Sequence, residues 1–307
     1  MSYDALVYGP IFCDLIFTDL PAMPELGKEL FAGEFTVAVG GAAIVAAGLH
    51  RLGARVGLIA ELGNDPLSAL TRQLLDEIGL DRTLVREHDE PLPQVTVGLS
   101  FPQDRAFITR FARPTHPPDL AAILRSHPAR HLHLCSFLSA LETPDACRLA
   151  HAAGLTVSFD PGWDEAALRD PRIGAVIAES DLFLPNDTEL RHIARLAEEE
   201  EAVPAVRAMM GEGMLVVKAG TQGATAYGPD ATPRASTRIL PVTPIDTTGA
   251  GDAFDAGFVY AFVNGLPLET CMRYGAVCGG LATTAQGGTG GLPTLTEVEA
   301  WLSKLPS

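Results

Sequence analysis

The chain has 307 residues and contains 22 basic and 38 acidic side chains, which gives a formal net charge of −16 at pH 7. This acidity argues against nucleic acids and anionic membranes as partners, because both attract proteins through a cationic surface. Hydrophobic residues make up 47% of the chain, which is enough for a sizeable buried core and argues against disorder. At about 150 residues per domain the length allows two domains, although one large α/β domain can also take up the whole chain.

The cysteines and the N-terminus are typical of a soluble cytoplasmic protein. The five cysteines are dispersed and contain no CxxC pattern, so we expect neither a disulfide framework nor a zinc knuckle. The N-terminal apolar stretch has no Lys or Arg before it and is interrupted by Asp4 and Asp14, unlike a signal peptide. The longest apolar stretch, residues 37–49, is too short to span a bilayer.

Short apolar segments typical of buried strands alternate with amphipathic segments along nearly the whole chain. The predicted strands cover residues 5–8, 55–59, 131–135, 155–159, 182–184 and 214–218. The predicted helices lie between them, at residues 42–52, 66–78, 145–153 and 188–196. This alternation predicts a parallel sheet covered by helices on both faces.

Two regions early in the chain depart from this alternation. Segments with the two-residue periodicity of antiparallel strands cover residues 12–17, 29–39, 94–101 and 105–111. The last two are separated by Pro102-Gln103-Asp104, which predicts a short hairpin connection. Insertions at about residues 12–39 and 94–111 would form a small sheet beside the core. We therefore expect one α/β domain over residues 1–307, with this sheet as an inserted lid.

The strongest local signal is the segment DTTGAGDAFDAGF, residues 246–258, which follows a predicted strand at 239–242 and opens an apolar helical stretch. The small residues 249–251 let the backbone close tightly around a ligand. The helix that starts there directs unpaired N–H groups and the positive end of its dipole outward, which favours an anion such as phosphate. Asp252 would repel a resting phosphate, so we expect it to accept a proton from an attacking hydroxyl. Taken alone, the motif could also be an ordinary glycine-rich turn.

Three other segments accompany this motif: residues 40–53 (GGAAIVAAGLHRLG), residues 186–189 (NDTE) and residues 216–224 (VVKAGTQGA). In this order the four segments resemble the signatures of the ribokinase-like (PfkB) family of carbohydrate and nucleoside kinases. The resemblance extends from about residue 5 to residue 290. It implies a three-layer α/β/α core with a mostly parallel sheet and a small antiparallel β lid.

The resemblance also implies ATP-dependent phosphorylation of a hydroxymethyl group on a sugar or sugar derivative. Asp252 would be the general base, and the amides of Gly249, Ala250 and Gly251 would form the anion hole. Asn186 and Glu189 would organise Mg²⁺ and its waters, although a Glu in a first helical turn can instead be a capping residue. Such a transfer asks the protein mainly for positioning and charge neutralisation.

The nucleotide and a monovalent cation have their own implied residues. The family pattern places ATP against Asn186, Lys218, Gly220, Thr221, Gly223, Gly249 and Gly251. For Lys218, an exposed lysine at the end of a strand is an equally good interpretation. In many members of the family the position of Asp246 and the region 285–288 build a site for a monovalent cation such as K⁺.

The acceptor site departs from the family pattern. By resemblance, Asp14 and the Gly40-Gly41 turn would hold the acceptor, but Ile44 and Phe12 stand where polar Asn residues are usual. This suggests an acceptor with a less polar edge, or one that is read by other residues such as Arg105. The sequence therefore predicts the reaction type more firmly than the substrate.

Other functions remain to be weighed against this interpretation. A nucleoside kinase of the same fold is the main alternative, and an apolar aromatic lid would favour it. A non-catalytic sugar sensor is less compatible with the retention of Asp252, Asn186 and Glu189. A dinucleotide-binding oxidoreductase is disfavoured because no GxGxxG follows the first predicted strand. We also expect that the lid sheet can mediate a homodimer.

Overall fold

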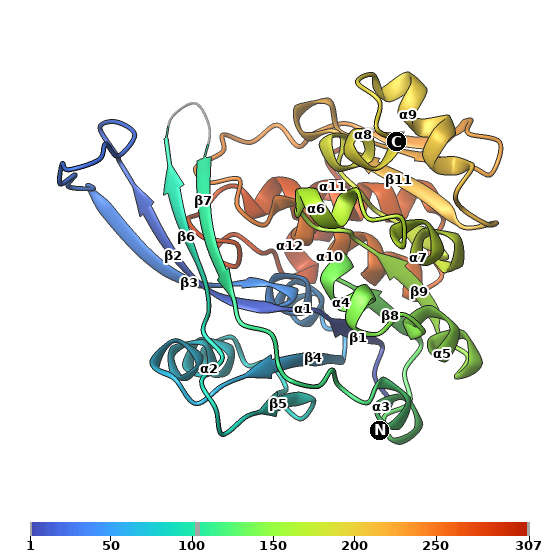
Figure 1. The fold of residues 1–307 in the computed structure, drawn as a ribbon. Coiled ribbons are helices and arrows are strands. Elements are labelled where there is room, and N and C mark those ends of the chain that lie inside the picture. The colour runs from blue at the N-terminus through green and yellow to red at the C-terminus, as the bar shows by residue number, and fades with distance from the viewer. Residues whose placement is uncertain (1, 102–104, 306–307) are drawn as a thin grey trace.

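The computed structural model describes residues 2–101 and 105–305, and its core is a nine-stranded sheet with helices on both faces (Figure 1). The strand order is β13-β12-β11-β10-β9-β8-β1-β4-β5. In chain order the strands are β1 (Ala5–Tyr8), β4 (Val56–Leu62), β5 (Val85–Glu87), β8 (His131–Leu134), β9 (Thr156–Phe159), β10 (Leu182–Phe183), β11 (Met214–Lys218), β12 (Ala224–Tyr227) and β13 (Pro233–Thr237). The strands from β11 to β5 pair in parallel, whereas β12 and β13 form an antiparallel edge.

The helices form one layer on each face of this sheet. One layer contains α3 (Leu120–Ser126), α4 (Phe137–Glu142), α5 (Ala146–Ala152), α6 (Glu165–Leu168), α7 (Ile173–Glu179), α8 (Asp187–Ala194) and α9 (Glu199–Arg207). The other contains α1 (Ala42–Arg51), α2 (Pro66–Ile78), α10 (Ala250–Val263), α11 (Leu268–Ala282) and α12 (Leu295–Leu302). This confirms the three-layer core that the sequence predicts.

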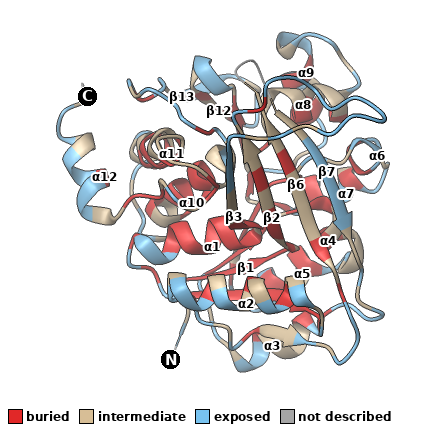
Figure 2. Cartoon of the chain, turned by 90° about the vertical axis from the view of Figure 1, so that its left-hand side faces the viewer, coloured by how far each residue is buried: buried red, intermediate tan, exposed pale blue. Residues whose placement is uncertain are grey.

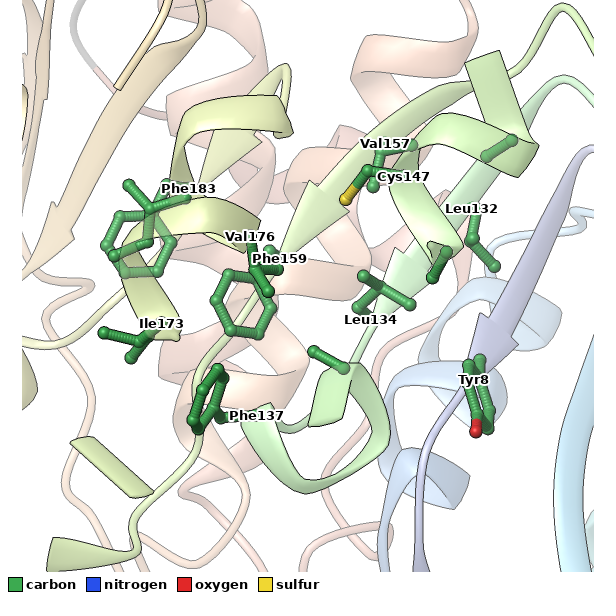
Figure 3. Close-up of a cluster of buried hydrophobic side chains, with 14 of the residues drawn as sticks. Tyr8, Leu132, Leu134, Phe137, Cys147, Val157, Phe159, Ile173, Val176 and Phe183 are labelled. Carbon is green, nitrogen blue, oxygen red and sulfur yellow. The ribbon is translucent and has the colours of Figure 1, made fainter. Parts of the chain in front are cut away.

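The core lies between the sheet and these two layers. Alternate residues of β1 belong to different clusters, with Leu6 and Tyr8 facing one layer and Ala5 and Val7 facing the other. In the first cluster the aromatic rings at the ends of neighbouring strands pack together, and the rings of β9 and β10 stack with centroids 5.4 Å apart (Figure 3). Each fully buried phenylalanine contributes about 2 kcal/mol of hydrophobic free energy. This packing holds the ends of the strands in place.

A second, smaller sheet stands beside the core and is less buried (Figures 1 and 2). Its strands are β2 (Ile11–Thr18), β3 (Glu34–Gly41), β6 (Gln94–Ser100) and β7 (Arg105–Phe111), in the order β3-β2-β6-β7. The pairs β2/β3 and β6/β7 are antiparallel, as the sequence predicts, and β2 and β6 join them in parallel. The predicted hairpin connection at 102–104 lies outside the described residues.

One local prediction is wrong, and several elements of the structure were not predicted. Residues 239–242 do not form a strand, because Pro241 has no N–H to donate to a neighbouring strand. The edge strand β13 lies earlier in the chain. Neither β13 nor its neighbour β12 was predicted. Several short helices that cover the sheet, such as α3, α4 and α7, were also not predicted. No helix within residues 2–101 and 105–305 is both long and apolar enough to cross a membrane.

Candidate active site

The candidate site residues gather where parallel strands of the large sheet end. The strands β9, β10 and β11 end just before Asp160, Asn186 and the 219–223 loop, and the carboxyl ends of parallel strands meet at one edge of a sheet. The backbone N–H of Lys218 donates to the carbonyl of Pro185 over 3.0 Å. The predicted metal and nucleotide segments are therefore neighbours, although they are about thirty residues apart in the chain.

The N-terminus of α10 has the geometry of an anion-binding turn. Gly249 is its N-cap residue, with a left-handed φ of 71°, and it has no side chain that could occupy the N–H groups of the first turn. A Cβ atom at this position would lie 2.9 Å from both the Cα of Gly288 and the Cδ1 of Ile44. Glycine is therefore required here by both backbone conformation and space.

Asp246 pins the loop that leads into this turn. Its Oδ1 accepts hydrogen bonds from the N–H (2.9 Å) and the hydroxyl (2.7 Å) of Thr248, and its Oδ2 accepts one from the N–H of Gly287 (2.9 Å). Gly287 thus lies against the loop before α10. Both oxygens of Asp246 already have partners in this arrangement.

Asp252 lies in the first turn of α10, directly after the glycine-rich turn. Burial, and secondarily the neighbouring carboxylate of Asp160, raise the pKa of Asp252 to about 7, while the ammonium of Lys218 acts in the opposite direction. A carboxyl with a pKa near neutrality can both accept and release a proton at the working pH. This property fits the predicted general base.

Asp14, on β2 of the small sheet, belongs to the same electrostatic group. Its side chain is buried, and burial together with the charges of Asp252 and Asp246 raises its pKa to about 7. A Cβ atom at Gly40 would overlap the carboxylate of Asp14, so glycine leaves room for it. Gly41 follows with a φ of 64° as the N-cap residue of α1. The structure therefore brings the predicted acceptor residues of β2 and β3 to the candidate base.

Lys218 is buried, so the interpretation as an exposed strand-end lysine is wrong. Its Nζ donates to Asp160 Oδ2 over 2.6 Å and to both carboxylate oxygens of Asp255 over 3.0 Å. Sequence reasoning did not single out either partner. Asp160 could have been found as an acidic residue directly after a buried strand, and Asp255 as the residue one helical turn after Asp252.

Asn186 and Glu189 form a reciprocal capping box at the start of α8. The Oδ1 of Asn186 accepts the N–H of Glu189, and the Oε2 of Glu189 accepts the N–H of Asn186, each over 2.8 Å. The capping interpretation of Glu189 is thus confirmed. Glu189 is also buried, and burial followed by the charge of Asp160 raises its pKa to about 8. A nearby cation would lower that pKa by stabilising the charged carboxylate.

The residues present fit a magnesium ion that is held partly by its substrate. Among the described residues no three His, Cys, Asp or Glu side chains form a cluster that could hold a metal by themselves. Mg²⁺ needs no such cage, because it keeps several waters and is usually held by one or two protein carboxylates and substrate phosphates. Glu189 is buried and Asp252 is partly buried, and the pKa of each is raised, so a nearby cation would stabilise the charged form of both carboxyls.

The predicted nucleotide loop is a single 3₁₀ turn, Gly220–Gln222, between β11 and β12. Thr221 is exposed, and Gly220 has a left-handed φ of 50°. Gly223 has a φ of 93°, and a Cβ there would overlap the carbonyl of Thr237. These glycines allow the backbone to turn back within three residues. The loop follows Lys218 directly in the chain and exposes Thr221 to solvent.

The remaining predicted acceptor residues have different surroundings. Arg105 reaches from β7 to the loop before α10, where its Nη1 donates to the Thr248 hydroxyl over 3.0 Å and lies 3.9 Å from Asp246 Oδ1. Ile44 is nearly fully buried and lies next to Gly249 of the anion-binding turn and next to Gly288. The Phe12 ring lies 5.9 Å from that of Phe111. An arginine and an aromatic pair thus line the side of the small sheet that faces the site.

Comparison with known proteins decides the family. The model of the "pfkB family carbohydrate kinase" matches residues 4–295. The chain belongs to this family. It is 32% identical over 276 residues to the ATP-dependent ribose-1-phosphate kinase of Halopiger xanaduensis, with 86% of each chain covered. It is 26% identical to the ribokinase of Haemophilus influenzae, over 96% of this chain and 97% of that one.

A solved structure supports the same assignment at the level of the fold. The Arabidopsis thaliana ribokinase complexed with ribose and ATP superposes with a TM-score of 0.82 and 24% identity, and the match covers 98% of this chain and 99% of that one. The protein therefore has the ribokinase fold. As a pfkB-family member it is a sugar or nucleoside kinase, a phosphotransferase that acts on an alcohol group.

Proposed function

We propose that this pfkB-family protein transfers the γ-phosphate of ATP to a hydroxymethyl group of a sugar or sugar derivative, with Asp252 as the general base. The observation that carries the proposal is the position of Asp252 in the first turn of α10, with a pKa near 7 and directly after the anion-binding turn. A base and an anion site on one helical turn can serve the two ends of the same reaction, the attacking hydroxyl and the transferred group.

The protein's residues carry out the steps as follows. Asp14, beside the Gly40-Gly41 turn, binds hydroxyls of the acceptor and orients them. The Asp252 carboxylate takes the proton of the attacking hydroxyl as the new O–P bond forms and the bond between the γ-phosphorus and the β–γ bridging oxygen breaks, so that ADP leaves. The N–H groups at residues 249–251 and the positive end of the α10 dipole stabilise the charge on the transferred phosphoryl group. The small sheet covers these residues and keeps water away, which limits hydrolysis of ATP.

The site requires cations for its cosubstrate. ATP would lie along the 3₁₀ turn at Gly220, Thr221 and Gly223, with its phosphates at the N-terminus of α10. Mg²⁺ would be held through water by Asn186 and Glu189, and when bound it neutralises phosphate charge. A monovalent cation such as K⁺ beside Asp246 stays a prediction, because hydrogen bonds from Thr248 and Gly287 already occupy both carboxylate oxygens.

We infer that the acceptor is a sugar rather than a nucleoside. Arg105 lies beside Thr248 at the anion-binding turn, where a guanidinium suits an acidic or phosphorylated sugar better than an uncharged base. The relative from Halopiger xanaduensis is named for a sugar phosphate, which agrees with this inference. The aromatic pair Phe12–Phe111 is the observation that favours the nucleoside alternative, because aromatic rings can stack on a base.

We also propose that the small sheet mediates a homodimer. Large apolar side chains are exposed on its strands and on the connection between β2 and β3: Met23, Leu26, Phe31, Phe35, Phe107 and Ile108. Exposed apolar groups gathered in one part of a structure often mark an interface. Sedimentation that gives a monomer at micromolar concentration would contradict this proposal. The five free cysteines suit a reducing compartment, and we place the protein in the cytoplasm.

An acceptor screen tests the proposed function. ADP release is measured with MgATP and ribose, ribose 1-phosphate, fructose, sugar acids and nucleosides, with Asp252→Asn as the inactive control. We expect acceptor-dependent ADP release that excess EDTA abolishes. A nucleoside as the best acceptor would favour the alternative, and the absence of ADP release with every class of acceptor would contradict the proposal.

A further inference from the structure

The buried ion cluster formed by Lys218, Asp160 and Asp255 joins three elements of the candidate site. Lys218 ends β11, Asp160 follows β9, and Asp255 lies on α10 one turn after Asp252. The ammonium donates to the two carboxylates over 2.6 and 3.0 Å, and the three residues are at most 9% exposed. Charges this deeply buried are retained only when each is paired.

The ammonium of Lys218 also lies directly against the anion-binding turn. A Cβ atom at Gly251 would be 3.6 Å from its Nζ and 4.0 Å from its Cε. The ammonium therefore lies close to the first turn of α10, on the side of Gly251. At this distance the charge acts on any group bound at the turn.

The groups that face Lys218 are mostly negative. Asp252, Asp160 and Asp255 on α10 and after β9, and Glu189 on α8, all act on it or on one another electrostatically. His133 on β8 adds no charge near neutral pH, because burial lowers its pKa to about 4. The loss of this one ammonium would leave a group of carboxylates facing the place where a phosphate is expected.

We propose that Lys218 is a positioning residue for phosphoryl transfer: it holds the first turn of α10 through Asp255 and supplies positive charge behind the anion-binding turn at Gly251. This inference rests on the proposed kinase function and assigns Lys218 a role other than nucleotide binding. Its partners fix the ammonium, so it needs no contact with the nucleotide. The positive charge then favours the transferred phosphoryl group more than bound ADP, because it lies at the turn rather than at the 219–223 loop.

The test uses two variants that break the same ion pair but change the charge in opposite directions. Lys218→Met removes the positive charge, and Asp255→Asn removes a negative one. Orthovanadate, a mimic of the transferred phosphoryl group, is titrated by calorimetry into each protein saturated with MgADP. We expect Lys218→Met to weaken vanadate binding at least about tenfold, with the ADP affinity changed less than about threefold. Asp255→Asn should weaken vanadate binding much less.

Other outcomes would overturn the inference. Equal losses of vanadate affinity in Lys218→Met and Asp255→Asn would mean that only the integrity of the ion cluster matters. A tenfold loss of ADP affinity in Lys218→Met would return the lysine to the nucleotide site, and a wild-type protein with MgADP that does not bind vanadate would also refute the role. If Lys218→Met does not fold, the double variant Lys218→Met/Asp255→Asn takes its place, because it removes both charges together. It should show the same loss of vanadate affinity.

The proposed function can fail separately from this inference. It is judged by acceptor-dependent ADP release of the wild-type protein, which does not involve vanadate. With an active acceptor, Lys218→Met should lower kcat at least about tenfold and change the KM for ATP less than about threefold. An active wild-type enzyme with an unimpaired Lys218→Met variant would refute the role of Lys218 and leave the kinase assignment intact.

Discussion

The substitution Asp252→Asn should stabilise the folded protein at alkaline pH while it removes activity. Asp252 is partly buried, and burial together with the charge of Asp160 raises the pKa of its carboxyl from an ordinary value of 3.8 to about 7. A carboxyl whose pKa is higher in the folded than in the unfolded state destabilises the fold when it is ionised. The neutral amide of Asn carries no such cost. The stabilisation should therefore appear above about pH 4, where the carboxyl of the unfolded chain becomes charged, and reach its full size above about pH 7.

The size of the stabilisation follows from the shift in the pKa of Asp252. A change of about 3 pKa units corresponds to about 4 kcal/mol at a pH above 7, since each unit contributes about 1.4 kcal/mol. The cost is absent below about pH 4, where the carboxyl is protonated in both states, and it grows between pH 4 and pH 7. Because Asp252 is only partly buried and solvent screens part of its charge, we expect a gain of about 2–4 kcal/mol at pH 8. For a chain of this length that is about 3–6 °C in Tm.

The assay is thermal unfolding of wild type and Asp252→Asn at pH 4.5 and pH 8. The matched control is Asp4→Asn, the same chemical change at a surface carboxylate. The pKa of Asp4 is lowered, because hydrogen bonds from Arg55 and Arg130 outweigh its partial burial, so this control should lose a little stability at pH 8. An Asp252→Asn variant that is less stable than wild type at pH 8, or whose Tm rises equally at both pH values, would contradict the raised pKa of Asp252.

Three further predictions concern activity. The kcat/KM of the wild type should rise with pH through about 7, because Asp252 must be ionised to accept a proton; a profile flat from pH 5 to pH 9 would argue against this base. Gly40→Ala should raise the KM for the acceptor at least about tenfold, because the new methyl group displaces the Asp14 carboxylate, while the KM for ATP stays the same. Glu189→Gln should raise the Mg²⁺ concentration for half-maximal activity at least about threefold without lowering Tm, since Gln also completes a capping box and carries no buried charge; an unchanged Mg²⁺ requirement would exclude Glu189 from the metal site.

Much of the fold could be predicted because its signals are local. The parallel strands are short apolar segments, and the motif at 246–258 contains a glycine that only its backbone conformation and close neighbours explain. The edge strands β12 and β13 were not predicted. Edge strands are only partly buried, so their sequences need not be continuously apolar, and the pattern of β13 is mostly exposed.

The candidate site shows a similar division. The residues within each motif could be predicted, but the cluster of Lys218 with Asp160 and Asp255 could not, because its members are 58 and 37 positions from the lysine. No periodicity connects charges that meet only when three elements pack together. The capping box, by contrast, is readable in the sequence as Asn186 followed three residues later by Glu189.

In the proposed mechanism Asp252 accepts the proton of the alcohol that attacks the γ-phosphate. The most direct test of this claim is a single-turnover measurement of γ-phosphate transfer from radiolabelled ATP to the best acceptor of the screen, with wild type and Asp252→Asn compared at pH 8. We predict that the variant binds MgATP with wild-type affinity and transfers phosphate at least about 100-fold more slowly. Transfer by Asp252→Asn at the wild-type rate would contradict the claim.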